Sequence, residues 1–200
     1  MTDPVNPAKP PTHSHNEKEA SSWVKRWSHL VKPGGCVLDV ACGRGRHALW
    51  FHQLNHPVVV VDRSQYAVDG IAIAASACKK IVADIENEPW PLAGQQFDAV
   101  VVTNYLWRPL MPTLLASLAP QGVLIYETFT SGNETVGKPS RPDFLLRPGE
   151  LLQICKELRV VAFEDGFVEC SGKSSPRFVQ RIVAIREDAS NSLPARYPLT

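Results

Sequence analysis

The sequence lacks the features that mark membrane, disulfide-rich or nucleic-acid-binding proteins. None of its apolar runs approaches the length that spans a membrane, and its N-terminus has no apolar core of a signal peptide. Its five cysteines are scattered without a CxxC pair, which argues against a disulfide framework or a zinc ribbon. The formal net charge of +1 gives no broad attraction toward nucleic acid or anionic lipid. We therefore expect a cytoplasmic protein, monomer or homodimer, with no nucleic-acid, membrane or metal partner.

The composition favours one globular domain. The chain has 200 residues, of which 44% are hydrophobic, and this is enough for a sizeable core. Residues 1–16 combine several prolines with polar residues, so we expect a disordered N-terminal tail there. We expect the domain over residues 17–187 and a C-terminal tail over residues 188–200.

One stretch, from Cys36 to Ala48, predicts a ligand site. An apolar run that contains Asp39 is followed by Gly43 and Gly45 and then by a helical pattern, which predicts strand, tight turn and helix. The glycines let backbone approach a ligand closely, and the helix starts with unpaired N–H groups. In open α/β sheets, nucleotides bind at such a turn, beyond the carboxyl end of a strand.

The rest of the chain alternates strand and helix patterns, which predicts a parallel sheet. The expected strands are 37–41, 58–61, 80–84, 97–102 and 122–129, and the expected helices begin at Glu17, at Ser64 (through Ala77), at Leu110 and at Leu151. Two further strands, 159–168 and 178–185, follow without a helix between them, which suggests a terminal antiparallel hairpin. Residues 130–148 form a long polar loop, either a lid over an acceptor or a surface crossing.

Three acidic residues narrow the range of ligands that would fit this site. The pattern Gly43-x-Gly45-x-x-Ala48 matches GxGxxG/A, and Asp62 lies near the distance expected of a ribose-binding acid. Asp39, inside its strand, suits a cation rather than a pyrophosphate, and Asp84 ends the next strand. Three acids at neighbouring strand ends suit an ammonium, a ribose diol and an adenine amine, which S-adenosylmethionine carries without any phosphate. The alternative is that these acids cap helices or shape turns.

At these residues the chain resembles the class I S-adenosylmethionine-dependent methyltransferases. The segment Leu38-Asp-Val-Ala-Cys-Gly-Arg-Gly45 is similar to that family's first motif, with Ala41 in place of its first glycine. The segment Gly137 to Leu151 is similar to the small methyltransferases grouped with the tellurite-resistance type. The resemblance implies a Rossmann-like, seven-stranded, mostly parallel sheet with helices on both faces and a C-terminal antiparallel hairpin.

The resemblance also implies roles for individual residues. The methionine end of S-adenosylmethionine would lie at Asp39 and the glycine turn, the ribose at Asp62, and the adenine at Asp84 and Ile85. The full set of implied cofactor-binding residues is Asp39, Ala41, Gly43, Gly45, Arg46, Asp62, Asp84, Ile85 and Asn104.

The expected reaction is methyl transfer to a small-molecule acceptor by in-line displacement. Its catalytic residues stay open, with His47, Asn104 and Tyr105 as candidates, and Tyr126 and Glu127 as further candidate bases. Tyr105 and Trp107 are expected to wall the acceptor site. The alternatives are a nicotinamide-dependent reductase and a non-catalytic protein that binds S-adenosylmethionine. No tyrosine is followed four places on by lysine, which disfavours the short-chain reductase type.

Overall fold

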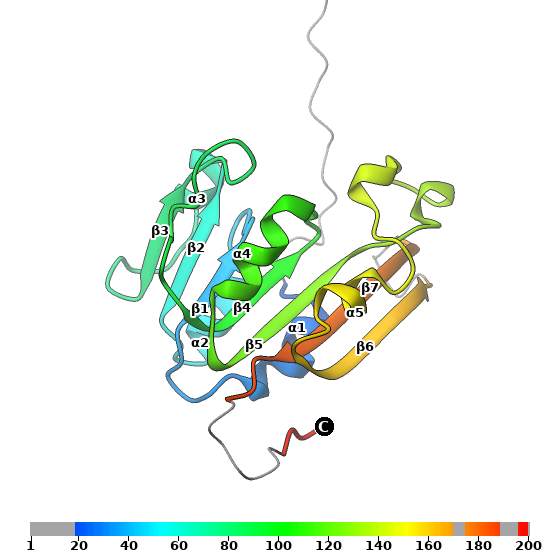
Figure 1. Cartoon of the computed structure of the whole chain (residues 1–200). Helices are drawn as coiled ribbons and strands as arrows, with labels where there is room; N and C mark the ends of the chain where they lie inside the picture. The colour runs from blue at the N-terminus through cyan, green and yellow to red at the C-terminus, as the bar shows by residue number, and fades with distance from the viewer. Residues whose placement is uncertain (1–18, 170–174, 189–195, 200) are drawn as a thin grey trace, which may run out of the picture.

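A computed structural model describes residues 19–169, 175–188 and 196–199 (Figure 1). Seven strands form one sheet in the order β3-β2-β1-β4-β5-β7-β6. Their bounds are β1 Val37–Val40, β2 Val58–Asp62, β3 Cys78–Val82, β4 Phe97–Thr103, β5 Leu118–Phe129, β6 Arg159–Val168 and β7 Arg177–Ile185. Strands β1 to β5 pair in parallel, whereas β7 is antiparallel to both β5 and β6. The predicted seven-stranded sheet with a C-terminal antiparallel hairpin is confirmed.

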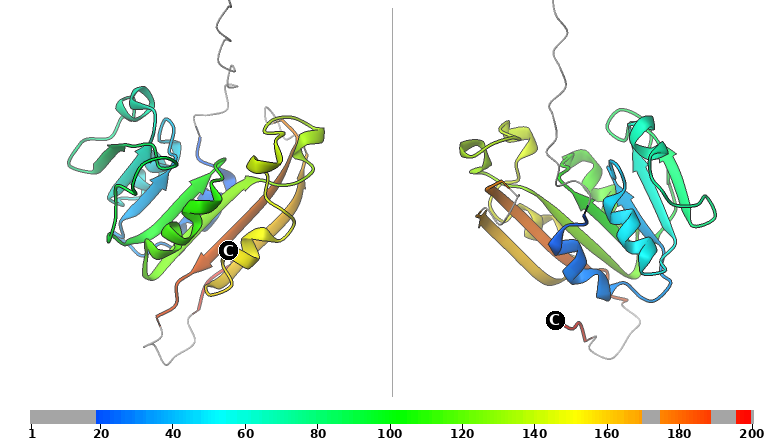
Figure 2. Two further views of the ribbon diagram at one scale, coloured as in Figure 1. Left: turned by 45° about the horizontal axis from the view of Figure 1, so that its top comes forward. Right: turned by 180° about the vertical axis from the view of Figure 1, so that it is seen from behind.

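Helices cover both faces of this sheet (Figures 1 and 2). Their bounds are α1 Ser22–Trp27, η1 Ser28–Leu30, α2 Arg46–Gln53, α3 Gln65–Asp69, η2 Arg108–Leu110, α4 Met111–Ala116, η3 Asn133–Thr135, η4 Pro142–Phe144 and α5 Glu150–Ile154. Seen from behind in Figure 2, α1 and α2 lie on one face, and α4 and α5 lie on the other. Within the described residues, no helix has the length and apolarity needed to cross a membrane.

The core forms two layers because successive strand residues point to opposite faces. On one face, Val101 and Ile125 share a buried cluster with Trp27 of α1 and Phe51 of α2. On the other, Leu38, Val100 and Leu124 share a cluster with Leu114 of α4 and Leu151 of α5. All four residues of β1 are buried, as expected for a central strand of a parallel sheet.

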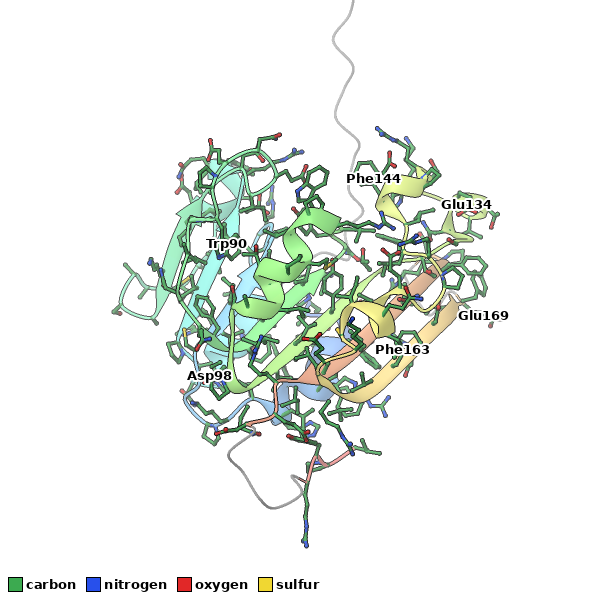
Figure 3. The ribbon with its side chains drawn as sticks, viewed as in Figure 1. Trp90, Asp98, Glu134, Phe144, Phe163 and Glu169 are labelled. Carbon is green, nitrogen blue, oxygen red and sulfur yellow. The ribbon has the colours of Figure 1, made fainter. Side chains whose placement is uncertain are left out.

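The strand order indicates that a ligand would bind beyond the carboxyl ends of the parallel strands. The chain moves outward from β1 to β2 and β3 and then returns to β4 on the other side of β1. In open α/β sheets, ligands bind beyond the carboxyl ends of the strands at such a reversal. Asp98, near the start of β4, lies at the opposite end of the strands, at the lower left of Figure 3.

Several predicted boundaries are wrong. The helix after Ser64 ends at Asp69 instead of continuing through Ala77: the Gly70 amide still donates to Tyr66 O, but the Ile71 amide donates to Val68 O, three residues back, and the helix goes no further. Helix α1 begins at Ser22, where Ser21 caps it, rather than at Glu17. Glu17, the predicted tail 1–16 and most of the predicted tail 188–200 lie outside the described residues.

Candidate cofactor site

The glycine turn joins β1 to α2 through backbone that favours glycine. Gly43 has φ +55° and Gly45 has φ +71°, both in the left-handed region. A Cβ added at Gly43 would meet nothing within 4 Å, so this residue borders open space. A Cβ added at Gly45 would lie 2.8 Å from the Ile71 side chain. Gly43 therefore leaves room for a ligand, whereas Gly45 also allows close packing of the turn on Ile71.

Ala41 adopts a conformation that its side chain disfavours. It directly follows β1 and has φ +51°. A left-handed conformation costs a non-glycine residue roughly 1–2 kcal/mol. The position where the family motif has glycine thus keeps glycine-like backbone geometry with alanine in place.

Asp39 lies beneath the start of α2. It is 1% exposed, and its Oδ2 accepts the Ala48 backbone N–H over 3.1 Å. Burial raises the pKa of Asp39 to about 7, although the Ala48 amide and Arg46 oppose this shift. The bond to the Ala48 amide fits the alternative that Asp39 caps a helix. The raised pKa of Asp39 also indicates that a nearby cation would stabilise its charged form.

Asp62 closes the turn from the neighbouring strand. Its Oδ2 accepts the Gly43 backbone N–H over 2.8 Å, and its Oδ1 accepts the Ser64 N–H over 2.9 Å. An ionised carboxylate has about four lone-pair sites, so each oxygen keeps acceptor capacity for a ligand hydroxyl. The Asp62 carboxylate is therefore fixed by the backbone on both sides and is partly exposed.

Asp84 lies two residues beyond β3 and shapes the turn that follows. Its carboxylate accepts the backbone N–H of Glu86 over 3.1 Å and the Asn87 side-chain amide over 2.9 Å. The Asn87 amide contributes most to lowering the pKa of Asp84. The prediction that β3 ends in this acid is wrong by two residues, because the acid belongs to the turn.

An open cavity of about 520 Å³ lies at this end of the sheet. It is lined by Arg63, Ser64, Val82, Ala83, Asp84 and Glu88. The cavity thus joins the segment after β2 to the segment after β3, beside Asp62. Ile85, which we expected against the adenine ring, is 9% exposed and packs into the core of the α4 face.

The segment after β4 carries three predicted residues. Asn104 is exposed, has φ +54°, and donates its backbone N–H to Glu127 O over 2.9 Å. Tyr105 and Trp107 are half-buried and pack against the core cluster on the α4 face. Burial, followed by the nearby Glu86 carboxylate, raises the pKa of Tyr105. The Tyr105 side chain therefore lies toward the Asp84 turn.

His47 is enclosed at the first turn of α2. It is 1% exposed; its Nε2 accepts the Ser21 backbone N–H over 3.3 Å, and its Nδ1 lies 3.4 Å from Thr103 Oγ1. Since Nε2 accepts, the ring proton is assigned to Nδ1. Burial lowers the pKa of His47 to about 3, and Arg46 adds to the effect. His47 is thus a neutral imidazole with both nitrogens engaged.

The two further candidate bases, both on β5, are also engaged. The Tyr126 hydroxyl donates to Tyr105 O over 2.7 Å, and burial raises the pKa of Tyr126 well above its usual value. Glu127 is 3% exposed; its Oε1 accepts from Ser21 Oγ over 3.0 Å and its Oε2 from Arg181 over 3.0 Å. These contacts favour structural roles for both side chains.

Sequence reasoning missed an ion pair that fastens the 130–148 loop. Arg108 donates through Nε to Glu150 over 2.7 Å, and through its other nitrogens to Asp143 O and Leu145 O over 3.0 and 2.8 Å. Glu150 is 5% exposed, and its arginine partners hold its pKa at about 2 despite burial. No periodic pattern predicts this pair, because its members lie on segments far apart in the sequence.

Comparisons with known proteins found one matching domain model and several similar folds. Residues 37–122 match the model of a methyltransferase domain. A search of the curated protein sequences found no match. The structure resembles TehB from Haemophilus influenzae, with a TM-score of 0.71 and 17% identity. The alignment covers 87% of this chain but 64% of that TehB chain, so the present chain spans less than two thirds of it.

Two other solved structures are also similar. A TehB-like S-adenosylmethionine-dependent methyltransferase from Corynebacterium glutamicum has a TM-score of 0.57 and 16% identity, over 82% of this chain and 88% of that one. The glycopeptide N-methyltransferase MtfA, complexed with S-adenosyl-L-homocysteine, has a TM-score of 0.59 and 16% identity, over 84% and 90%. Residues 37–122 thus match a methyltransferase domain, and the described residues share the fold of S-adenosylmethionine-dependent methyltransferases.

Proposed function

We propose that this protein transfers the methyl group of S-adenosylmethionine to a small-molecule acceptor by in-line displacement. The observation that carries the proposal is the group of three acids near the carboxyl ends of neighbouring strands: Asp39 within β1, Asp62 at the end of β2 and Asp84 two residues beyond β3. When bound, S-adenosylmethionine supplies an electrophilic methyl group on a sulfonium, which is a good leaving group. The protein is then left mainly with the tasks of binding and alignment.

The residues present fit this cofactor in charge and in space. Asp39 would face the ammonium, because its buried carboxylate gains from a cation. Asp62 would accept from the ribose hydroxyls with its remaining lone pairs, and Asp84 from the adenine amine at the cavity between β2 and β3. Gly43 leaves the approach to the turn open. The first turn of α2, with Arg46, would hold the carboxylate of the methionine end.

The candidate bases are already hydrogen-bonded within the protein, which supports an acceptor that needs no base. His47, Tyr126 and Glu127 are buried, and each is already hydrogen-bonded to protein groups. The proposed acceptor therefore attacks through an atom that carries no proton at neutral pH, such as a thiolate or another soft anion. Alignment in near-attack geometry supplies the rate enhancement in this case.

The 130–148 loop is proposed as a fixed wall on the acceptor side rather than a freely moving lid. The Leu146 N–H donates to Phe129 O over 3.0 Å near its base, and Asn133 accepts the Phe178 N–H over 3.1 Å. Arg108 fastens its second half to the segment after β4, as described above. Figure 3 shows Glu134 and Phe144 of this loop beyond the carboxyl ends of the parallel strands.

Calorimetry and a transfer assay test the proposal together. S-adenosylhomocysteine should bind the purified full chain with a measurable heat. NADH, which a nicotinamide-dependent reductase would bind, should give no heat. Radiolabelled methyl from S-adenosylmethionine should then pass to a member of an acceptor panel of thiols, inorganic oxyanions, amines and carboxylic acids. Binding without transfer to any acceptor would favour the non-catalytic alternative, and a response to NADH alone would favour the reductase.

A further inference from the structure

A row of polar side chains crosses four strands on the α1 face, near the carboxyl ends of β4 and β5. The backbone register pairs Thr103 with Glu127, Glu127 with Arg181, and Arg181 with Glu164. Arg181 donates to Glu127 Oε2 over 3.0 Å and lies 2.6 Å from Glu164 Oε2. Its guanidinium also lies 4.9 Å from the centre of the Trp23 ring of α1.

Ser21 joins this row to the helix that follows the glycine turn. Its hydroxyl donates to Glu127 Oε1 over 3.0 Å, while its backbone N–H donates to His47 Nε2 over 3.3 Å. The same hydroxyl accepts the backbone N–H groups of Trp23 and Val24 and so caps α1. Ser21, which is half-buried, thus connects α1, α2 and β5, and its partners His47 and Glu127 are almost fully buried.

The segment that Ser21 anchors lies beside the proposed cofactor site. His47 follows Gly45 of the turn by two residues, and Thr103, its other partner, directly precedes Asn104. Arg46 donates to the backbone oxygen of Glu19 over 3.5 Å. Residues 19–21 therefore contact the first turn of α2, where the methionine end of the cofactor is proposed to lie.

We propose that Ser21 is a positioning residue that fixes residues 19–21 as a wall of the methionine end of the cofactor site. This inference rests on the proposed function. Ser21 touches neither the cofactor nor the acceptor in this account; it acts through His47 and Glu127. The bond to Glu127 is charge-assisted, and the bond to His47 reaches an imidazole that is itself almost fully buried; together they hold the segment in a single place.

The test compares calorimetric binding of S-adenosylhomocysteine to the wild-type full chain and to Ser21→Ala. Because Ser21→Ala loses the hydroxyl contact to Glu127, its dissociation constant for S-adenosylhomocysteine should rise roughly five- to tenfold. This is less than the full effect of losing one charge-assisted hydrogen bond, since Ser21 acts on the site indirectly. Ser21→Thr keeps a hydroxyl for both Glu127 and the helix cap, so its dissociation constant should stay within about twofold of wild type.

Ser28→Ala is the matched control, because Ser28 is also a serine at an end of α1 and loses one hydroxyl bond, to Lys25 O over 2.9 Å. It contacts neither His47 nor Glu127, so it should lower the melting temperature without changing the dissociation constant. Equal weakening by Ser21→Ala and Ser28→Ala, or unchanged binding by Ser21→Ala, would overturn the positioning role alone. No binding by wild type would overturn the proposed function and this inference together.

Discussion

Replacing Asp39 by asparagine should stabilise the free protein and weaken cofactor binding. Burial raises the pKa of Asp39 from 3.8 to about 7 in the folded state. The folded state therefore favours the neutral form, and the corresponding stability is complete below pH 3.8 and is lost as the pH rises through 7. Asparagine is neutral at every pH and keeps an oxygen acceptor for the Ala48 N–H.

The size of this stabilisation follows from the difference between the folded and unfolded pKa values of Asp39. The difference corresponds to about 4 kcal/mol in the free energy of unfolding at pH 8, to about 2 kcal/mol at pH 5, and to little below pH 4. For a domain of this size, each 1 kcal/mol shifts the melting temperature by about 2–4 °C. The melting temperature of Asp39→Asn should therefore exceed that of wild type by about 8–16 °C at pH 8 and by about 4–8 °C at pH 5.

Cofactor binding should respond in the opposite direction. Loss of a charge-assisted contact to the ammonium should cost roughly 1.5–3 kcal/mol, or about 10- to 100-fold in the calorimetric dissociation constant of S-adenosylhomocysteine. In wild type, binding should weaken as the pH falls below about 7, because Asp39 then takes up a proton. The variant should lose this pH dependence.

Asp98→Asn is the control at the other end of the sheet. Asp98 pairs with Lys32 over 2.7 Å and accepts the Cys36 N–H over 2.8 Å, far from the proposed site (Figure 3). It should lower the melting temperature slightly and leave binding unchanged. A lower melting temperature for Asp39→Asn at pH 8, or a dissociation constant equal to that of wild type, would refute the reasoning about Asp39.

Three further substitutions test the turn and the loop. Ala41→Gly relieves a left-handed φ of +51° and should raise the free energy of unfolding in urea by up to about 1 kcal/mol; a decrease would show that Ala41 is not strained. Gly45→Ala should lower that free energy by about 2 kcal/mol or more, since its Cβ would lie 2.8 Å from Ile71, and it should cost less when it is made in an Ile71→Ala background; an equal cost in both backgrounds would exclude the clash as the cause. Arg108→Lys loses the forked contact to Glu150 and should cost about 1–2 kcal/mol at pH 7. Because the pKa of Glu150 is lowered to about 2, wild type should lose this contribution as the pH falls from about 4.5 through 2; an equal cost at pH 7 and pH 2 would contradict the ion pair as its source.

The parts of the fold that depend on local periodicity were predictable from sequence. Four successive valines predict the buried strand β2, and Gly43 and Gly45 predict the turn before α2, because each signal lies within a few residues. The boundaries that failed depend on single contacts. Helix α3 ends early, where the Ile71 amide donates to Val68 O, and Asp84 bonds to the turn after β3 instead of extending that strand.

The candidate site was predictable where the chain carries a motif and unpredictable where it depends on distant pairing. Asp39 and Asp62 both lie beside the glycine turn as the motif implies, and Asp62 bonds directly to Gly43. By contrast, the contacts of Ser21 and Arg181 with Glu127 join segments more than 50 residues apart. Such contacts follow from strand order and register, which the sequence pattern does not specify in enough detail.

A crystal structure of the full chain with S-adenosylhomocysteine tests the central claim most directly. We expect the Asp62 carboxylate within hydrogen-bonding distance of both ribose hydroxyls, the Asp84 carboxylate near the adenine amine, and the methionine end at the first turn of α2. A ligand bound elsewhere, or in this place with both carboxylates turned away from it, would contradict the account.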